Sequence, residues 1–145
     1  MENYDLCVLG GGPSGYAAAM RAVDFGKKVI LVERNRLGGA GVYNGALSSK
    51  TFWELSKEIA SMRHKLDGYG MKMPQISFGN ILEEVDNAVY ERSAQLEEHL
   101  RQIVHRDGEN FRFVKGSGRL LTPNKIEMRG EFEPYVVRSD YTIIA

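Results

Sequence analysis

The chain has 145 residues, of which 43% are hydrophobic, and its 19 basic and 19 acidic residues leave no net charge. This length and composition predict one domain with a real core and exclude a disordered chain. The absence of a basic excess argues against a nucleic-acid partner, and no apolar run approaches the roughly 18–20 residues that cross a bilayer. Since no targeting signal opens the sequence, we expect a cytoplasmic protein without a membrane partner, and zero net charge is compatible with a homo-oligomer.

The first part of the sequence has the pattern of a strand, a helix and a second strand. Residues 4–9 and 28–33 are short apolar runs typical of buried strands. Residues 14–25 between them favour a helix, and Gly26 suits the left-handed position that follows a helix. Two strands joined in this way pair in parallel through a right-handed crossover. We therefore predict an α/β fold built on a parallel sheet.

The middle of the sequence predicts two helices. Residues 34–44 are rich in glycine and are predicted to form a loop. Helical patterns follow at 45–66 and 78–105, and the turn residues between them predict a break. The second pattern carries one apolar stripe, which indicates a long helix packed on a sheet or on its partner helix.

The last third of the sequence consists of short apolar segments. Residues 111–115 predict a strand, and residues 141–145 predict a final buried strand. Between them, turn residues separate three short segments, which predicts a three-stranded antiparallel meander formed by residues 119–121, 125–129 and 134–138.

Residues 10–15 (GGGPSG) form a G-x-G-x-x-G motif directly between the first strand and the first helix. In this context Gly10 permits the tight turn, Gly12 lets a pyrophosphate approach the backbone, and Gly15 lets the helix pack closely on the strand. The free N–H groups and positive dipole of the helix start favour phosphate binding. The motif therefore predicts a dinucleotide site, against the alternative of a glycine-rich turn without a ligand.

Glu33 ends the second strand 18 residues after Gly15. A carboxylate at this place can accept hydrogen bonds from a ribose 2′-hydroxyl and would repel a 2′-phosphate. FAD and NAD present the same adenosine diphosphate to such a unit. The motif alone therefore leaves the choice between FAD and NAD open.

Residues 4–33 closely resemble the FAD-binding start of the pyridine nucleotide–disulfide oxidoreductases, the family of dihydrolipoamide dehydrogenase. In that family the first glycine motif binds FAD and a later one binds NAD, and this sequence has no second G-x-G-x-x-G. The resemblance therefore implies a Rossmann-like FAD-binding domain. It implies FAD contacts from Gly10, Gly12, Pro13, Ser14, Gly15, Glu33 and Arg34.

Residues 37–50 resemble the segment that carries the redox disulfide in this family, but the two cysteine positions fall on Gly41 and Ala46. Without thiols there is no thiolate to take electrons from reduced flavin. The one cysteine, Cys7, lies on the wrong side of the glycine motif to substitute. The sequence therefore excludes disulfide chemistry by the family mechanism.

The resemblance also implies further contacts to the cofactor. Lys50, with Gly38 and Gly39, would lie near the flavin, where a cation stabilises negative charge on the reduced ring. The alternative for Lys50 is an exposed lysine in the first turns of a helix. Residues 116–118 (Gly116, Ser117 and Gly118) would meet the adenine or form a plain turn, and Ala145 leads toward a further FAD contact.

We expect residues 1–145 to be the N-terminal part of a truncated FAD-binding domain, without the NAD-binding and dimerisation domains of the family. The parent enzyme would pass a hydride from NAD(P)H to FAD and on to an acceptor other than a disulfide, and the fragment alone would be inactive. Alternatives are a non-catalytic FAD- or nucleotide-binding module and an NAD-binding domain. The three histidines lack metal-ligand spacing, so no metal is predicted.

Overall fold

The computed structural model describes residues 1–43, 45–130 and 133–145. Asn44, the last residue of the predicted loop, lies outside the described residues. None of the described helices is long and apolar enough to cross a membrane. In chain order the elements are β1 (Asn3–Leu9), α1 (Pro13–Asp24), β2 (Val29–Glu33), α2 (Gly39–Val42), α3 (Ala46–Gly68), α4 (Phe78–Asp107), β3 (Phe111–Thr122), β4 (Lys125–Gly130) and β5 (Tyr135–Ile144).

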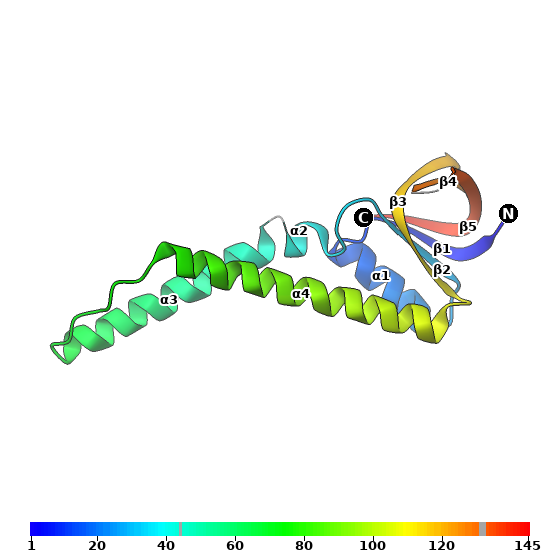
Figure 1. Ribbon diagram of the computed structural model, residues 1–145. Coiled ribbons are helices and arrows are strands. Elements are labelled where there is room, and N and C mark those ends of the chain that lie inside the picture. Colours follow the sequence, from blue (N-terminus) through cyan, green and yellow to red (C-terminus); the bar gives the residue numbers. More distant parts are fainter. Residues whose placement is uncertain (44, 131–132) are drawn as a thin grey trace.

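The five described strands form one sheet that closes on itself (Figure 1). β1 pairs in parallel with β2 on one side and with β5 on the other, and β2 pairs in parallel with β3. β4 then pairs antiparallel with both β3 and β5 and so closes the barrel. The predicted α/β class, with a parallel sheet, helices and a three-stranded antiparallel meander, is confirmed.

The strands of the meander differ from the prediction in their extent. The segments 111–115 and 119–121 belong to one strand, β3, and β5 likewise joins a meander segment to the final parallel strand. The glycines that resembled a turn are paired: Gly116 faces Gly130, where a Cβ on Gly116 would lie 2.2 Å from the carbonyl oxygen of Arg129. The glycine therefore permits close backbone approach where β3 passes from the parallel sheet into the meander.

The parallel strands bury side chains on both faces, as the continuous apolar runs predict. Along β2 every residue is buried, and successive side chains point to opposite faces. Val29 and Leu31 pack with α1 and α4 side chains, including Ala19 and Leu100, on one face. The other face packs inside the barrel against the meander, in a cluster of Tyr4, Cys7, Ile30, Val32, Ile126, Met128 and Val137.

The two long helices form a hairpin that projects away from the barrel (Figure 1). α4 packs its C-terminal half on the sheet through Leu96, Leu100 and Ile103, whereas α3 has no buried residue. Both predicted helices are confirmed, with slightly later C-terminal ends. The predicted loop before them contains the four-residue helix α2, too short to carry a periodic pattern.

We predict that Gly116→Ala lowers the free energy of unfolding by about 1–3 kcal/mol, because the new methyl group is forced into the β4 backbone. Gly68→Ala is the matched control: nothing lies within 4 Å of its added Cβ, and alanine favours a helix. Chemical denaturation monitored by circular dichroism measures both variants. Equal stability of the two would contradict the close approach at Gly116.

Candidate cofactor-binding site

A cleft of about 1360 Å³ lies where the parallel strands end, at the C-terminal ends of β1, β2 and β5 and beside the middle of β3. Ligands of open α/β sheets bind at this edge. Segments far apart in the sequence meet there. Among the residues predicted from the sequence, those lining the cleft are Gly10, Gly12, Pro13, Ser14, Glu33, Arg34, Gly39, Gly116, Ser117, Gly118 and Ala145.

The three glycines of the motif have different surroundings. Gly10 has φ +114°, and a Cβ there would lie 2.2 Å from the carbonyl oxygen of Ala145. A Cβ on Gly15 would lie 2.0 Å from the carbonyl oxygen of Gly10. In contrast, a Cβ on Gly12 would have nothing within 4 Å and would stand in the cleft that this residue lines. Gly10 and Gly15 are therefore required by the fold, whereas Gly12 leaves space in the cleft.

The first turn of α1 opens into this cleft. The helix begins at Pro13, and Gly12, its N-cap residue, has no side chain to cap the helix. Pro13 has no N–H, so Ser14 and Gly15 supply the first free N–H groups of the helix. These donors and the helix dipole form an environment that favours an anion.

Glu33 is fixed in the wall of the cleft. Its side chain is buried, its Oε2 accepts a hydrogen bond from the N–H of Gly11 at 2.6 Å, and its Oε1 accepts one from the N–H of Asn35 at 2.6 Å. Each carboxylate oxygen has a second lone pair available to a ligand hydroxyl. The sequence predicted a ligand contact here, but it did not predict the backbone contacts to Gly11 in the glycine turn and to Asn35 in the loop after β2.

Basic side chains give the cleft a positive wall. Arg34, Arg36 and Lys115 line it, and the guanidinium of Arg36 lies 5.0 Å from the centre of the Tyr43 ring. Sequence reasoning did not find several lining residues, because α3, α4 and the segment after β2 reach the cleft only in three dimensions. These residues are Asn35, Arg36, Tyr43, Ser48, Asp86 and Val89.

Three residues predicted at the site are placed elsewhere. Gly15 packs behind the turn, and Gly38 donates from its N–H to the carbonyl of Gly11 at 2.8 Å. Lys50 is exposed on α3 and is not among the described residues that line the cleft. Ser48, two residues earlier, does line it. A flavin contact from Lys50 therefore stays a prediction.

The family model for FAD-dependent oxidoreductases matches residues 5–114 of the chain. The chain belongs to this family. Dihydrolipoyl dehydrogenase of Vibrio parahaemolyticus is 34% identical over 142 residues, and that of Bacillus subtilis is 26% identical over 140 residues. Both alignments cover 97% of this chain, but the chain spans only 29% and 30% of those relatives.

The fold of this FAD-dependent oxidoreductase chain is also found in a solved flavoprotein. The copper(II) complex of RclA, a flavoprotein disulfide reductase of Escherichia coli, superposes with a TM-score of 0.75 over 100% of this chain and 29% of RclA. The two sequences are 15% identical, so this likeness concerns the fold. The resemblance of the sequence to the disulfide oxidoreductases is confirmed by these relatives and by the family match.

The position of the first missing cysteine is closed by packing. A Cβ on Gly41 would lie 2.3 Å from Cγ of Pro13, so the short helix α2 rests directly against the start of α1. Ala46, at the second cysteine position, is exposed at the start of α3. In this member of the oxidoreductase family, the absence of the thiols is therefore accompanied by packing of α2 against the Pro13 ring, which leaves no space for a side chain at position 41.

Cys7 lies fully buried between the sheet and the meander, in the cluster that contains Ile30 and Met128. Burial raises the pKa of its thiol to about 12. A buried, protonated thiol is a poor nucleophile and a poor reductant. Cys7 therefore has a packing role. No group of three or more acidic, histidine or cysteine side chains within the described residues is arranged to hold a metal ion.

We predict that the native chain does not react with Ellman's reagent near neutral pH, because Cys7 is inaccessible and protonated. Denaturation in guanidinium chloride should release one reactive thiol. The stability contributed by the neutral thiol is complete below its ordinary pKa of 9.0 and is lost as the pH rises toward 12. Cys7→Ala should flatten this alkaline decline, and rapid labelling of the native chain would contradict the assignment.

We predict that the double variant Gly41→Cys with Ala46→Cys is less stable than Ala46→Cys alone by about 1–3 kcal/mol, because the side chain at position 41 overlaps Pro13. Adding Pro13→Ala should recover most of this loss. Thermal unfolding and free-thiol counts measure both effects. A double variant that is as stable as the single variant would show that α2 does not press on α1.

Proposed function

We propose that the cleft binds FAD and that the chain supplies the adenosine-diphosphate part of the cofactor site in an FAD-dependent NAD(P)H oxidoreductase similar to dihydrolipoyl dehydrogenase. The observation that carries the proposal is the meeting of three segments at the end of the parallel strands. These segments are the glycine turn at 10–15, the carboxylate of Glu33, and residues 116–118 of β3. A Rossmann-like dinucleotide site requires the first two of these, at this edge of the sheet.

The open space beside Gly12 fits the pyrophosphate, because it is the one position of the motif where an added Cβ would fill the cleft without touching the protein. The N–H group of Ser14, which lines the cleft in the first turn of α1, would donate to a phosphate oxygen. Arg34 and Lys115, which line the same cleft, add positive charge. The free lone pairs of Glu33 would accept from the ribose hydroxyls of the adenosine.

The adenine and flavin ends of the cofactor follow from this placement. Backbone groups of Gly116 and Gly118 would meet the adenine, since neither residue has a side chain to block the base. Gly39 lines the cleft beside Gly12, since a Cβ on Gly39 would lie 3.3 Å from the Cα of Gly12, and Lys50 supplies a cation nearby in the sequence. Bound FAD supplies hydride-accepting chemistry, and a cation near the ring stabilises its reduced form.

The electron acceptor of the whole enzyme would not be a disulfide. Gly41 and Ala46 carry no sulfur, and Cys7 is buried on the far side of β1 from the helices. NAD(P)H as donor, with its own binding domain and a dimerisation domain, would belong to a longer parent chain. Residues 1–145 would then form the N-terminal part of its FAD-binding domain. The relatives, which are more than three times as long as the matched region, support this proposal.

We predict that the purified chain takes up FAD saturably, measured by the change in flavin fluorescence. Gly12→Ala should weaken binding at least about tenfold while leaving the unfolding temperature unchanged, because its methyl group meets only the ligand. Gly15→Ala should instead lower the unfolding temperature, because its methyl group meets the backbone of Gly10. A folded wild-type chain that takes up no FAD would overturn the proposal. Equal affinity of Gly12→Ala would remove the pyrophosphate from this turn.

A further inference from the structure

Two arginines among the described residues lie against tyrosine rings. The guanidinium of Arg36, in the cofactor cleft, lies 5.0 Å from the centre of the Tyr43 ring. That of Arg112, at the start of β3, lies 5.3 Å from the centre of the Tyr135 ring. A guanidinium stacked on a ring keeps the N–H donors at its edge for a carboxylate or a phosphate. The groups around each pair therefore determine what each arginine can bind.

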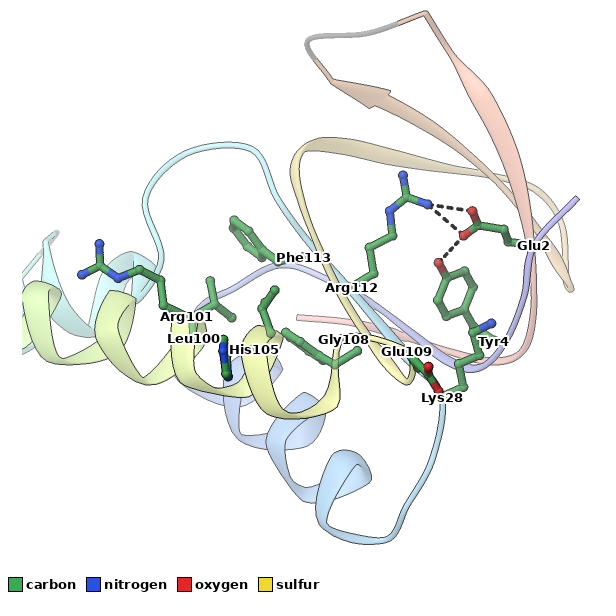
Figure 2. A pocket seen from close by; sticks show the side chains of 12 residues that line it. Glu2, Tyr4, Lys28, Leu100, Arg101, His105, Gly108, Glu109, Arg112 and Phe113 are labelled. Carbon is green, nitrogen blue, oxygen red and sulfur yellow. Dashed lines mark hydrogen bonds and ion pairs between the residues drawn. The ribbon is translucent and has the colours of Figure 1, made fainter.

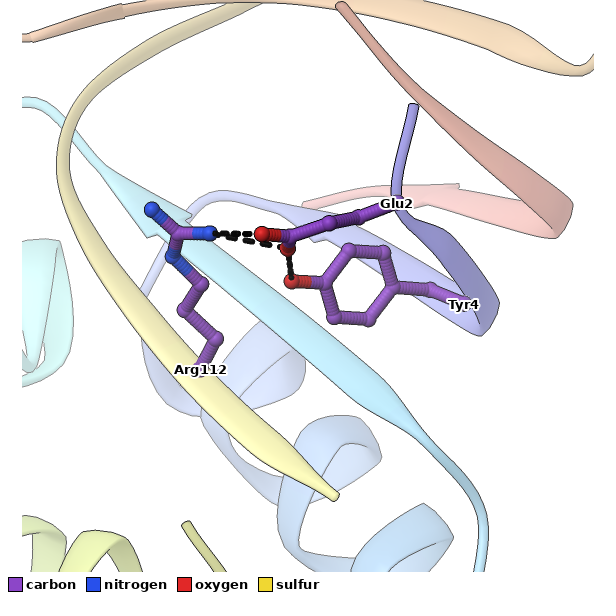
Figure 3. Close-up of polar contacts among 3 residues, drawn as sticks. All are labelled: Glu2, Tyr4 and Arg112. Atoms are coloured by element: carbon purple, nitrogen blue, oxygen red, sulfur yellow. Dashed lines mark hydrogen bonds and ion pairs between the residues drawn. The ribbon is translucent and has the colours of Figure 1, made fainter. Parts of the chain in front are cut away.

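The charge of Arg112 is used within the protein. Arg112 lines a cavity of about 810 Å³ formed by the end of α4 and the starts of β1 and β3, none of whose residues lines the cofactor cleft (Figure 2). Its guanidinium donates to both carboxylate oxygens of Glu2, at 2.8 and 2.9 Å, and the hydroxyl of Tyr4 donates to one of them (Figure 3). This arginine joins β3 to the start of β1, and its charge is balanced by Glu2.

Arg36 has no such carboxylate. It is exposed at the cleft, and the ion pairs within residues 1–43, 45–130 and 133–145 do not include it. Two described carboxylates line the cleft with it: Glu33 is bonded to backbone N–H groups, and Asp86 on α4 forms no ion pair with Arg36. An unpaired guanidinium in a ligand cleft matches a phosphate group, because two parallel N–H groups can donate to two phosphate oxygens.

The backbone of Arg36 is fixed beside the glycine turn. The N–H of Gly39 donates to the carbonyl of Arg36 at 3.1 Å, and a Cβ on Gly39 would lie 3.3 Å from the Cα of Gly12. Gly12 is the residue that leaves space in the cleft for a pyrophosphate. Arg36 therefore projects from a loop that directly contacts the proposed position of the pyrophosphate.

The ring of Tyr43 holds the other end of the Arg36 side chain. Tyr43 follows Gly39 by one turn, and its N–H donates to the carbonyl of Gly39 at 2.9 Å. Its side chain is half-buried and packs on the core cluster that contains Val42 and Leu96. Because the ring is fixed by this packing, the guanidinium loses less conformational freedom when it binds a ligand.

We propose that Arg36, held against Tyr43, binds the diphosphate of the cofactor and makes the cleft selective for adenosine diphosphates over adenosine. This inference rests on the proposed function, because it assigns a further residue to the same site. Arg36 is the residue that contacts the ligand and determines the selectivity. Tyr43 is a positioning residue that acts through Arg36.

The test measures the affinity of the full chain for ADP and for adenosine by NMR titration, which registers dissociation constants up to the millimolar range. Arg36→Gln should lose at least about tenfold in affinity for ADP, because a charged donor to the phosphate is removed. Its affinity for adenosine should stay at the wild-type value. Unchanged affinity for ADP, or equal losses for ADP and adenosine, would overturn the inference.

Variants of Tyr43 test the positioning role. Tyr43→Leu should weaken binding of ADP, and Tyr43→Phe should restore the affinity, since phenylalanine keeps a ring for the guanidinium. When Arg36 is already glutamine, Tyr43→Leu should cause no further loss, because residues that act through one contact are not additive. Additive losses would contradict a role of Tyr43 through Arg36.

Arg112→Gln is the matched control, since it also removes an arginine that is stacked on a tyrosine, but outside the cleft. It should bind ADP as wild type does, and circular dichroism checks that each variant is folded. Equal losses in Arg112→Gln and Arg36→Gln would overturn the inference. If the wild type takes up FAD and Arg36→Gln still binds ADP normally, the inference alone fails. A folded wild type that binds neither FAD nor ADP overturns the proposed function as well.

Discussion

The fold and the candidate site both depend on a point where three backbone segments meet with no space for a side chain. The turn after β1, the first turn of α1 and the end of β5 converge there. The N–H of Ala145 donates to the carbonyl of Leu9 at 2.9 Å, and any Cβ on Gly10 or Gly15 would overlap backbone atoms. Because this packing fixes the turn, the helix N–H groups point into the cleft before any ligand arrives.

Glu33 connects that packing to the proposed chemistry. A buried carboxylate is costly unless it is hydrogen-bonded, and the backbone of Gly11 and Asn35 provides the bonds. The same two contacts hold the carboxylate at the wall of the cleft, where its remaining lone pairs would be available to a ligand. One side chain therefore holds the turn and, under the proposed function, would also bind the ribose, so its substitution should affect both the apoprotein and the complex.

The sequence predicted most of the fold because its strongest patterns are local. The βαβ unit follows from two apolar runs around a helical one, and the two long helices follow from their periodicity. The division of β3 into separate segments was wrong because Gly116 and Gly118 resemble turn residues, whereas in the fold they permit close approach of β4 and of Leu9. The sequence does not distinguish a glycine that is needed for a turn conformation from one that is needed because a side chain would not fit.

The sequence predicted those residues of the candidate site whose neighbouring strands and helix could also be recognised from the sequence. The glycine turn and Glu33 belong to one βαβ unit, so their placement follows from its geometry. Asp86 and Val89 reach the cleft from α4, through the packing of a helix that no local pattern directs there. The exposure of Lys50 likewise depends on the orientation of α3, which the sequence does not specify.

The hairpin of α3 and α4 and the sheet should differ in the free energy that is needed to unfold them locally. α3 buries no residue, and its contacts with α4 include the stacked rings of Phe52 and Phe78, whose centres lie 6.4 Å apart. Such a segment opens by local unfolding at a much lower free energy than the sheet, and its amides exchange with solvent faster. Since Ser48 of α3 and Asp86 of α4 line the cleft, a ligand held there would slow this opening. Amide exchange in the hairpin would therefore report on occupancy of a site some turns away.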